Sequence, residues 1–325
     1  MLNFFTAVRR AAFGAELREV MCTARGFRVT DTGARARIET IGSALLHGYD
    51  AALAGAGSQV LSLSLGVVDS ELRGFAFEGV GMALTVLDQV DPRRTNRWRG
   101  FVDGLGSSHV EIAHVGAGLA FARLPRGRAR LERFLPRCDE QSRWLVVDGY
   151  GFHHGFFNWP RAIDRQERPS FRSAYAARAF DQGLGRSLWF VEGADVDRVI
   201  ARVRTFEPTR QADLVSGVGL AAAYAGGVDE EALGRLATNA GAELGHLQVG
   251  VALAAMARWR GGNPSPHTAA ASKVICSSGD TELAQIGFQA RDQALADGPP
   301  DPYPNRYERW RAQTRSAIQG LGVSH

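Results

Sequence analysis

Apolar residues recur at helical spacing along most of the chain, in stretches rich in alanine, leucine and glycine. Two of them, VGAGLAFARL and VGVALAAMARW, place small residues three and four positions apart, which favours helices that approach one another closely. Shorter amphipathic stretches such as GRARLERFLPR and ADVDRVIARVRTF lie between them. Glycine or proline follows each stretch within a few turns and is expected to end the helix. The pattern predicts an all-α chain.

The apolar stretches also recur at a nearly constant interval. Consecutive anchor glycines lie 31 to 37 residues apart, and the anchors are Gly48, Gly81, Gly116, Gly151, Gly183, Gly219, Gly250 and Gly287. Helical hairpins of about 34 residues are the unit of tetratricopeptide-like arrays. We therefore expect about eight such units in a single domain over residues 1–325, forming a tetratricopeptide-like solenoid or a closed α/α array. Paired glycines such as Gly149 and Gly151 are interpreted as points of close backbone approach within repeat helices.

Three segments depart from the repeat. Residues 1–30 are expected to contain an N-terminal helix, on which Phe4, Phe5, Val8 and Ala12 form an apolar stripe that packs onto the body. Residues 158–173 are polar, contain two prolines and are interpreted as a possible hinge between two halves. Residues 297–325 are expected to form a Pro-rich C-terminal extension with a final short helix.

Composition narrows the function classes. The net charge is +4 and the arginines are scattered rather than clustered, which argues against nucleic-acid binding. The three cysteines are widely separated, and the first residues do not read as a secretory signal, so we expect a cytoplasmic protein. The apolar runs are too short to span a bilayer.

The densest group of chemically active side chains lies in the stretch WLVVDGYGFHHGFF, residues 144–157. Its polar members could form an acid–base cluster in an aromatic cavity, and the candidate catalytic residues are His153, His154, Tyr150 and Asp148. Other repeats carry alanine or leucine at these places. A buried helix whose histidines merely bond to neighbouring groups remains an equal alternative.

Aromatic residues near this stretch suggest an apolar binding cavity. The candidate ligand-binding residues are Phe152, Phe156, Phe157, Trp189, Phe190 and Arg186. Arg186, Trp189 and Glu192 share one helical face, which predicts an internal ion pair beside an aromatic wall.

Two Glu-x-x-His pairs raise the possibility of a metal site. Such pairs on separate helices, with further glutamates, hold two metal ions in ferritin-like bundles. The candidate ligands are Glu111, His114, Glu243 and His246, with Glu78 and Glu192 as further carboxylates, and the cofactor would be di-iron or di-manganese. Glu–His pairs that only stabilise their own helices are the alternative.

Several long segments also resemble a known family. In this order, the segments FEGVGMALTVLD, HVGAGLAFARLP, DGYGFHHGFF, FDQGLGRSLWFVEGAD and SGVGLAAAYAGG resemble a bacterial family of unknown function encoded in enediyne polyketide biosynthetic cassettes (UnbL-like proteins). The likeness extends from about residue 25 to about residue 276. It implies a cytoplasmic protein of enediyne-core maturation, with other cassette proteins as partners, one of them embedded in the membrane. It supplies no reaction and no catalytic residue.

These observations leave the choice between enzyme and binding protein open. A helical array with an aromatic interior suits a long apolar rod, and the resemblance implies a linear polyene or polyyne intermediate as that rod. The first hypothesis is a protein that binds or acts on this intermediate. The alternatives are a non-catalytic helical-repeat scaffold or carrier that docks partner proteins, and a di-metal carboxylate oxidase of the desaturase type.

Overall fold

The computed structural model describes residues 13–55, 57–91, 95–297 and 305–321, and all regular structure in these ranges is helical. This confirms the all-α class. Each predicted anchor glycine lies in one long helix, in chain order: α3 (Thr32–Leu53), α5 (Arg73–Val90), α7 (Val110–Arg123), α9 (Arg143–Phe157), α10 (Ala174–Val191), α12 (Pro208–Tyr224), α14 (Leu244–Gly261) and α16 (Asp280–Ala296).

A second helix follows each long one and completes a hairpin. After α9 this place is taken by the π-helical segment η4 (Pro160–Asp164), and the other second helices are α4 (Ser58–Gly66), α6 (Arg97–Asp103), α8 (Gly127–Phe134), α11 (Val196–Arg204), α13 (Glu230–Ala240), α15 (Pro266–Cys276) and α17 (Arg306–Leu321). The remaining short elements are α2 (Cys22–Arg25) and the 3₁₀ turns η1 (Leu17–Val20), η2 (Ser107–His109), η3 (Leu135–Arg137) and η5 (Gly241–Glu243).

Local sequence sets where several helices begin. The side chain of Asp31 accepts a hydrogen bond from the Ala34 amide at the start of α3, and Asp195 and Asp229 cap α11 and α13 in the same way. Such caps satisfy amide groups that have no partner within the helix. The apolar faces of the second helices then turn inward; in α11 the buried side chains are Val196, Val199, Ile200 and Val203.

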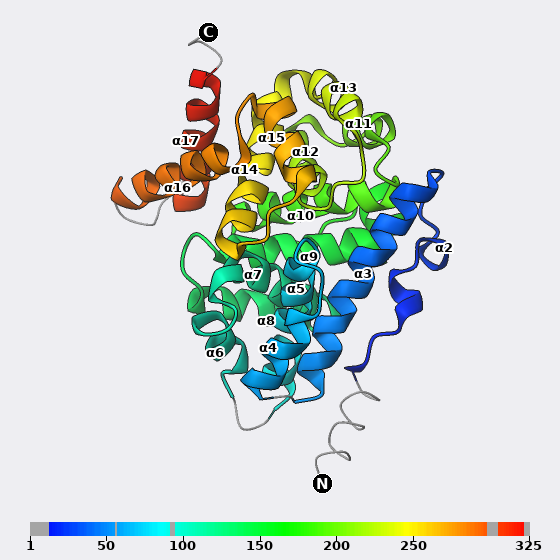
Figure 1. Cartoon of the computed structure of the whole chain (residues 1–325), viewed down its shortest axis with the longest axis vertical. Coiled ribbons are helices and arrows are strands. Elements are labelled where there is room, and N and C mark those ends of the chain that lie inside the picture. Colours follow the sequence, from blue (N-terminus) through cyan, green and yellow to red (C-terminus); the bar gives the residue numbers. More distant parts are fainter. Residues whose placement is uncertain (1–12, 56, 92–94, 298–304, 322–325) are drawn as a thin grey trace.

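Paired glycines bring consecutive long helices into backbone contact (Figure 1). In α9, a Cβ on Gly149 would overlap the Val115 carbonyl of α7, and a Cβ on Gly151 would overlap the Phe180 carbonyl of α10. The first glycine of each pair thus faces the preceding helix, and the second faces the next. The same arrangement holds in α5, α7, α10 and α12. The interpretation of these glycines as points of close backbone approach is therefore confirmed.

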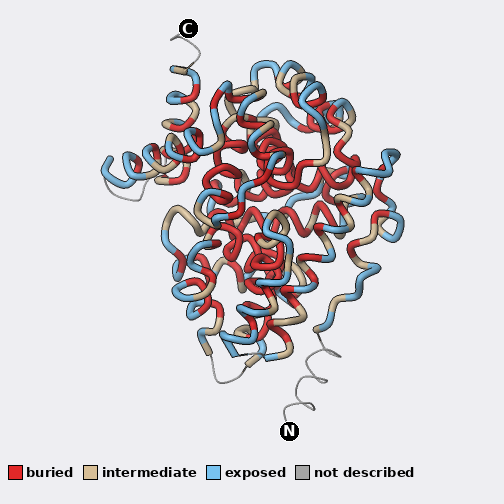
Figure 2. Tube along the Cα trace, in the orientation of Figure 1, coloured by how far each residue is buried: buried red, intermediate tan, exposed pale blue. Residues whose placement is uncertain are grey.

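The array curls so tightly that its early and late repeats touch. The guanidinium of Arg37 on α3 donates to the Ala225 carbonyl after α12 at 2.8 Å, and the ring of Phe75 on α5 packs edge-on against Tyr224 at 5.1 Å. The side chain of Arg258 on α14 donates to the Glu71 carbonyl before α5. The long helices therefore surround a common interior, and buried residues fill the middle of the molecule (Figure 2).

The two ends of the described chain pack against this body. The Arg28 amide donates to the Val191 carbonyl at 2.8 Å, and the indole of Trp159 donates to the Arg25 carbonyl at 2.9 Å. The expected stripe of Phe4, Phe5, Val8 and Ala12 lies outside the described residues. At the other end, the predicted extension over residues 297–325 contains α17, which packs against α16 and α14 (Figure 1).

Two further features bear on the expected organisation. Residues 158–173 connect α9 and α10, which pack closely on each other, and the hinge stays a prediction. Among the residues that the structure describes, no helix combines the length and the apolar character needed to cross a bilayer.

Candidate functional site

Three adjoining cavities run through the interior of the array. The N-terminal chamber lies between α3, α5, α7, α9 and α10 and has a volume of about 60 Å³. The middle chamber, of about 30 Å³, shares four lining residues with it, namely Phe75, Glu78, Arg186 and Phe190. The C-terminal cleft, of about 350 Å³, shares Glu111, Leu145 and Leu253 with the middle chamber. The shared residues place the three cavities next to one another in a row, which we call the interior path.

One position of the repeat supplies the wall of this path. The residue directly after each glycine pair, or after the Gly250–Ala252 pair in α14, lines a chamber or the cleft in six consecutive long helices: Met82, Leu119, Phe152, Arg186, Leu220 and Leu253. Because the glycines fix which side of each helix meets its neighbours, they also fix which side faces the interior. Five of these six positions are apolar, and Arg186 is the exception.

A buried charged group lies where the two chambers meet. We call it the Glu78 cluster, and it consists of Glu78, Asp148, Gln182 and Arg186. The Arg186 guanidinium donates to Asp148 Oδ1 and lies 3.8 Å from Glu78 Oε1, and the Gln182 amide donates to Asp148 Oδ2 at 2.9 Å. One arginine is therefore shared between two carboxyl groups. The Arg186 guanidinium also lies 4.8 Å from the centre of the Phe152 ring.

The two carboxyl groups of the Glu78 cluster have unequal support. Burial raises the pKa of Glu78 to about 7, although the charge of Arg186 opposes this. Burial also raises the pKa of Asp148, but Asp148 accepts hydrogen bonds from both Arg186 and Gln182. Within the described residues, Glu78 Oε1 has no hydrogen-bond partner. Asp148 thus holds the arginine, and Glu78 is the group that takes up or releases a proton near neutral pH.

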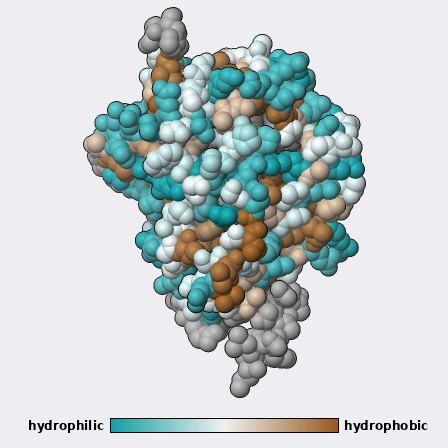
Figure 3. Space-filling model, in the orientation of Figure 1, coloured by the Kyte–Doolittle hydropathy of each residue, from teal (hydrophilic) through white to brown (hydrophobic). Residues whose placement is uncertain are grey.

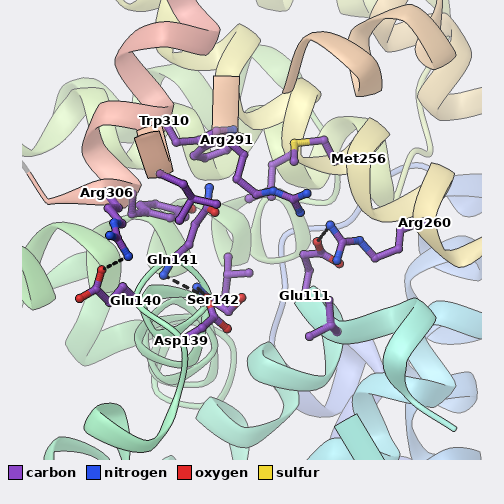
Figure 4. A pocket seen from close by; sticks show the side chains of 15 residues that line it. Glu111, Asp139, Glu140, Gln141, Ser142, Met256, Arg260, Arg291, Arg306 and Trp310 are labelled. Atoms are coloured by element: carbon purple, nitrogen blue, oxygen red, sulfur yellow. Dashed lines mark hydrogen bonds and ion pairs between the residues drawn. The ribbon is translucent and has the colours of Figure 1, made fainter. Parts of the chain in front are cut away.

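The mouth of the path is the C-terminal cleft, which is lined by α7, α14, α16, α17 and the turn before α9 (Figure 4). Two ion pairs lie on opposite sides of it: Glu111 with Arg260 at 3.2 Å, and Glu140 with Arg306 at 2.7 Å. Burial raises the pKa of Glu111, against the charge of Arg260. Glu111 lines both the cleft and the middle chamber, so it marks the boundary between open and enclosed space.

The structure divides the four predicted catalytic residues between two faces of α9. Asp148 belongs to the Glu78 cluster, and His153 lines the N-terminal chamber, where burial lowers its pKa well below the usual value. Tyr150 and His154 pack on each other at 4.6 Å, and His154 lines a different pocket beside η4. The quartet of His153, His154, Tyr150 and Asp148 is therefore not one constellation.

Most of the predicted ligand-binding residues do meet in one place. The N-terminal chamber is lined by five of the six, namely Phe152, Phe156, Phe157, Arg186 and Phe190. Trp189 does not line a chamber, because its indole is fully buried and donates to the Gly226 carbonyl at 2.9 Å. The predicted pair of Arg186 with Glu192 is also wrong: Glu192 contacts Arg28 and Arg202 instead.

The predicted metal ligands Glu111, His114, Glu243 and His246 do not converge. His114 Nδ1 donates to the Val110 carbonyl and the ring packs edge-on against Trp98, while Glu111 faces Arg260. Glu243 and His246 face each other at 3.8 Å at the start of α14, beside Arg315. In the part of the chain that the structure describes, no three His, Cys, Asp or Glu side chains are placed to hold one metal ion. The predicted ligands therefore lie in separate pairs, and the di-iron or di-manganese hypothesis stays a prediction.

Glu78 is the site residue whose role the sequence did not reveal. We expected it only as a further metal ligand. Its signal lies in the repeat register, because the residue before the first glycine of the pair is polar and buried in four helices: Glu78, Asp148, Gln182 and Ser216. Polar side chains that recur at one buried position of an apolar repeat indicate a shared interior network.

The fold and these cavities define a class, an α-helical repeat protein with an elongated interior path and a buried charged site. The chain matches the model of one protein family over residues 4–318. It belongs to this family, whose members are described as proteins of unknown function (DUF1702). No curated protein and no solved structure matches the chain. The expected membership of a family of unknown function is thereby established.

Proposed function

We propose that this protein binds an elongated, apolar, unsaturated small molecule along the interior path. The observation that supports this most directly is the row of adjoining cavities, in which the two chambers are lined mostly by aromatic and aliphatic side chains. The C-terminal cleft also carries charged side chains, among them Glu140, Arg260 and Arg306. By the resemblance of its repeat segments, we further propose that the ligand is the linear polyene or polyyne intermediate of enediyne-core maturation, and that the protein works with other proteins of that cassette in the cytoplasm.

The cavity volumes suggest how such a ligand would lie. Ligand pockets commonly have volumes of about 300–1,000 Å³. Of the three cavities in the row, only the C-terminal cleft, at about 350 Å³, falls in this range. The two chambers have room for a few waters only. The body of the ligand would therefore occupy the cleft, and its narrow unsaturated end would enter the middle chamber past Glu111 and Leu253.

Binding can be tested with diphenylhexatriene, a rod-like polyene that becomes fluorescent when it leaves water. We expect saturable binding to the purified full chain with a Kd of roughly 1–10 μM. Leu253→Trp places a large ring where the cleft meets the middle chamber, and we expect it to weaken binding about tenfold or more. Fluorescence titration measures both values.

A surface variant provides the control for this titration. Val67 lies on the exposed face beside α4 and is 79% exposed, so Val67→Ser should leave the affinity for diphenylhexatriene unchanged. The melting temperature of Leu253→Trp would be recorded to separate blocked binding from general unfolding. Wild-type affinity in a folded Leu253→Trp, or loss of affinity in Val67→Ser, would place the probe outside the interior path.

A second candidate function is a scaffold that docks a partner protein. One observation favours it: Val60, Leu63 and Val67 form an exposed apolar face over α4 (Figure 3), with Leu63 69% exposed. Contiguous exposed apolar side chains often mark interaction surfaces.

The two functions predict opposite results in a producing strain. Leu63→Glu is expected to change the free energy of unfolding by less than about 0.5 kcal/mol, because the side chain is on the surface. Under the ligand-binding proposal, Leu63→Glu keeps product formation and Leu253→Trp abolishes it, as measured by metabolite titre. The reverse result would favour the scaffold.

A further inference from the structure

We propose that Glu78 and Arg186 form a proton-transfer site, which shifts a double bond in an unsaturated chain that carries a carbonyl group. This inference rests on the proposed function, because it requires such a chain to reach the middle chamber. It goes beyond binding by assigning a reaction class, an isomerisation, and a substrate class, a conjugated or skipped enone.

The position of Glu78 is that of a base within an enclosed cavity. Its side chain is only 2% exposed, it lines both chambers, and its Oε1 atom has no hydrogen-bond partner in the described part of the chain. A buried carboxyl oxygen without a hydrogen-bond partner lowers the stability of the fold, unless a ligand donates a hydrogen bond to it or a proton neutralises the group.

Arg186 is held where it can stabilise a developing negative charge. One N–H group of the Arg186 guanidinium donates a hydrogen bond to Asp148, and the guanidinium lies over the Phe152 ring. The Gln182 amide donates to Asp148 and holds that carboxylate in place. Gln182 is itself bonded to the Tyr307 hydroxyl at 3.1 Å. Arg186 thus lies 3.8 Å from Glu78 without depending on it for its orientation. A fixed cationic donor of this kind stabilises an enolate oxygen without reorganising during the reaction.

The step balances without a co-reactant. The Glu78 carboxylate removes a proton from a carbon activated by the carbonyl group, and the electron pair passes through the conjugated chain to the carbonyl oxygen. An Arg186 N–H donates to that oxygen. The Glu78 carboxylic acid then returns the proton to another carbon of the chain, the double bond shifts, and the carboxylate is restored. No atom and no electron is gained or lost.

The surroundings favour this chemistry. Phe75, Phe190 and Tyr224 line the middle chamber, so a chain that enters it would displace the few waters that it can hold. Since the pKa of Glu78 lies near 7, its acid and base forms are both present at neutral pH, as a group that must accept and return a proton requires.

The test uses a linear conjugated dienone with a saturated tail as the probe, incubated with the full chain in D₂O. Deuterium uptake at the methylene group next to the diene, followed by NMR, reports proton removal directly. We expect uptake by the wild type to fall about 100-fold or more in Glu78→Gln, with partial recovery in Glu78→Asp. The wild-type rate should rise with pH through about 7, because the carboxylate is the active form.

A buried carboxylate outside the path gives the matched control. Glu192 is 1% exposed, lies at the C-terminal end of α10 and pairs with Arg198 and Arg202 of α11. Glu192→Gln should keep the wild-type exchange rate per folded molecule. The melting temperature of Glu78→Gln at pH 8 should equal or exceed that of the wild type, which shows that the loss of exchange is not caused by unfolding.

The outcomes separate this inference from the proposed function. If diphenylhexatriene does not bind the wild type, the proposed function fails. If it binds but the wild type does not accelerate deuterium uptake, or if Glu78→Gln exchanges as fast as the wild type, the proton-transfer site is overturned and binding stands.

Discussion

Replacing Gly183 by alanine is expected to lower the free energy of unfolding by about 3 kcal/mol or more. A Cβ at this position would overlap the carbonyl oxygen of Asp148 and the amide nitrogen of Phe152, which both belong to the backbone of α9. No side chain can rotate to relieve this overlap, so α10 and α9 must separate. The separation would also disturb the bond between Asp148 and Arg186. Denaturant titration measures the loss.

Gly234 provides the control for this substitution. It lies within α13, and a Cβ there would meet no atom within 4 Å. Alanine has the higher helix propensity, so Gly234→Ala is expected to raise the free energy of unfolding by roughly 0.5–1 kcal/mol. If Gly183→Ala and Gly234→Ala changed the free energy of unfolding by the same amount, helix propensity alone would explain both changes. The close contact between α9 and α10 would then contribute nothing to stability.

The repeat was predictable because it is a property of the chain itself. The spacing of glycines and small residues reflects the contact of each helix with its neighbours, and every unit repeats that contact. For this reason the eight anchors each fall in one long helix. Even the role of Gly149 and Gly151 followed from their recurrence, since a phosphate-binding loop would not recur in sister units.

The direction in which side chains point was predicted less well. Helical periodicity gives the angular positions of Asp148, Tyr150 and His154 around the helix axis. It does not say which side of the helix faces the interior. The curl of the array decides this, and it turns Tyr150 and His154 away from the chambers. The aromatic residues Phe152 and Phe156 were placed correctly because they share the face of Asp148.

Long-range partners were not predictable from spacing within one helix. Arg186 on α10 and Glu192, directly after its end, lie six residues apart, yet they do not pair with each other. Arg186 pairs with Glu78 and Asp148 of earlier repeats. Glu192 pairs instead with Arg28 of the N-terminal segment and Arg202 of α11. The pairs that form depend on the closure of early repeats onto late ones, as in the contact of Arg37 with Ala225. No local pattern encodes that closure. The register of Glu78, Asp148 and Gln182 relative to the glycine pairs was the available clue.

Glu78→Gln is expected to stabilise the protein at pH 8 by about 3 kcal/mol. Burial raises the pKa of Glu78 from 4.5 to about 7 in the folded chain. Below pH 4.5 the carboxyl group is neutral in both the folded and the unfolded chain, so its full contribution to stability is present. Between pH 4.5 and 7 only the unfolded chain releases the proton, and stability falls by about 1.4 kcal/mol per pH unit. Glutamine has the shape of the neutral acid and avoids this loss.

The pH dependence distinguishes this effect from a change in packing. At pH 5 the folded Glu78 is neutral, and the stability of Glu78→Gln should exceed that of the wild type by less than about 1 kcal/mol. Denaturant titrations at pH 5 and pH 8 give both differences. Glu192→Gln is the opposite case, because it removes the buried carboxylate that Arg28 and Arg202 share and leaves them only the more exposed Asp164. It should therefore destabilise the protein at pH 8. A Glu78→Gln variant less stable than the wild type at pH 8 would mean that ionised Glu78 supports the fold through Arg186. A more stable variant would identify Glu78 as a residue retained despite its cost to stability, as expected of a functional group.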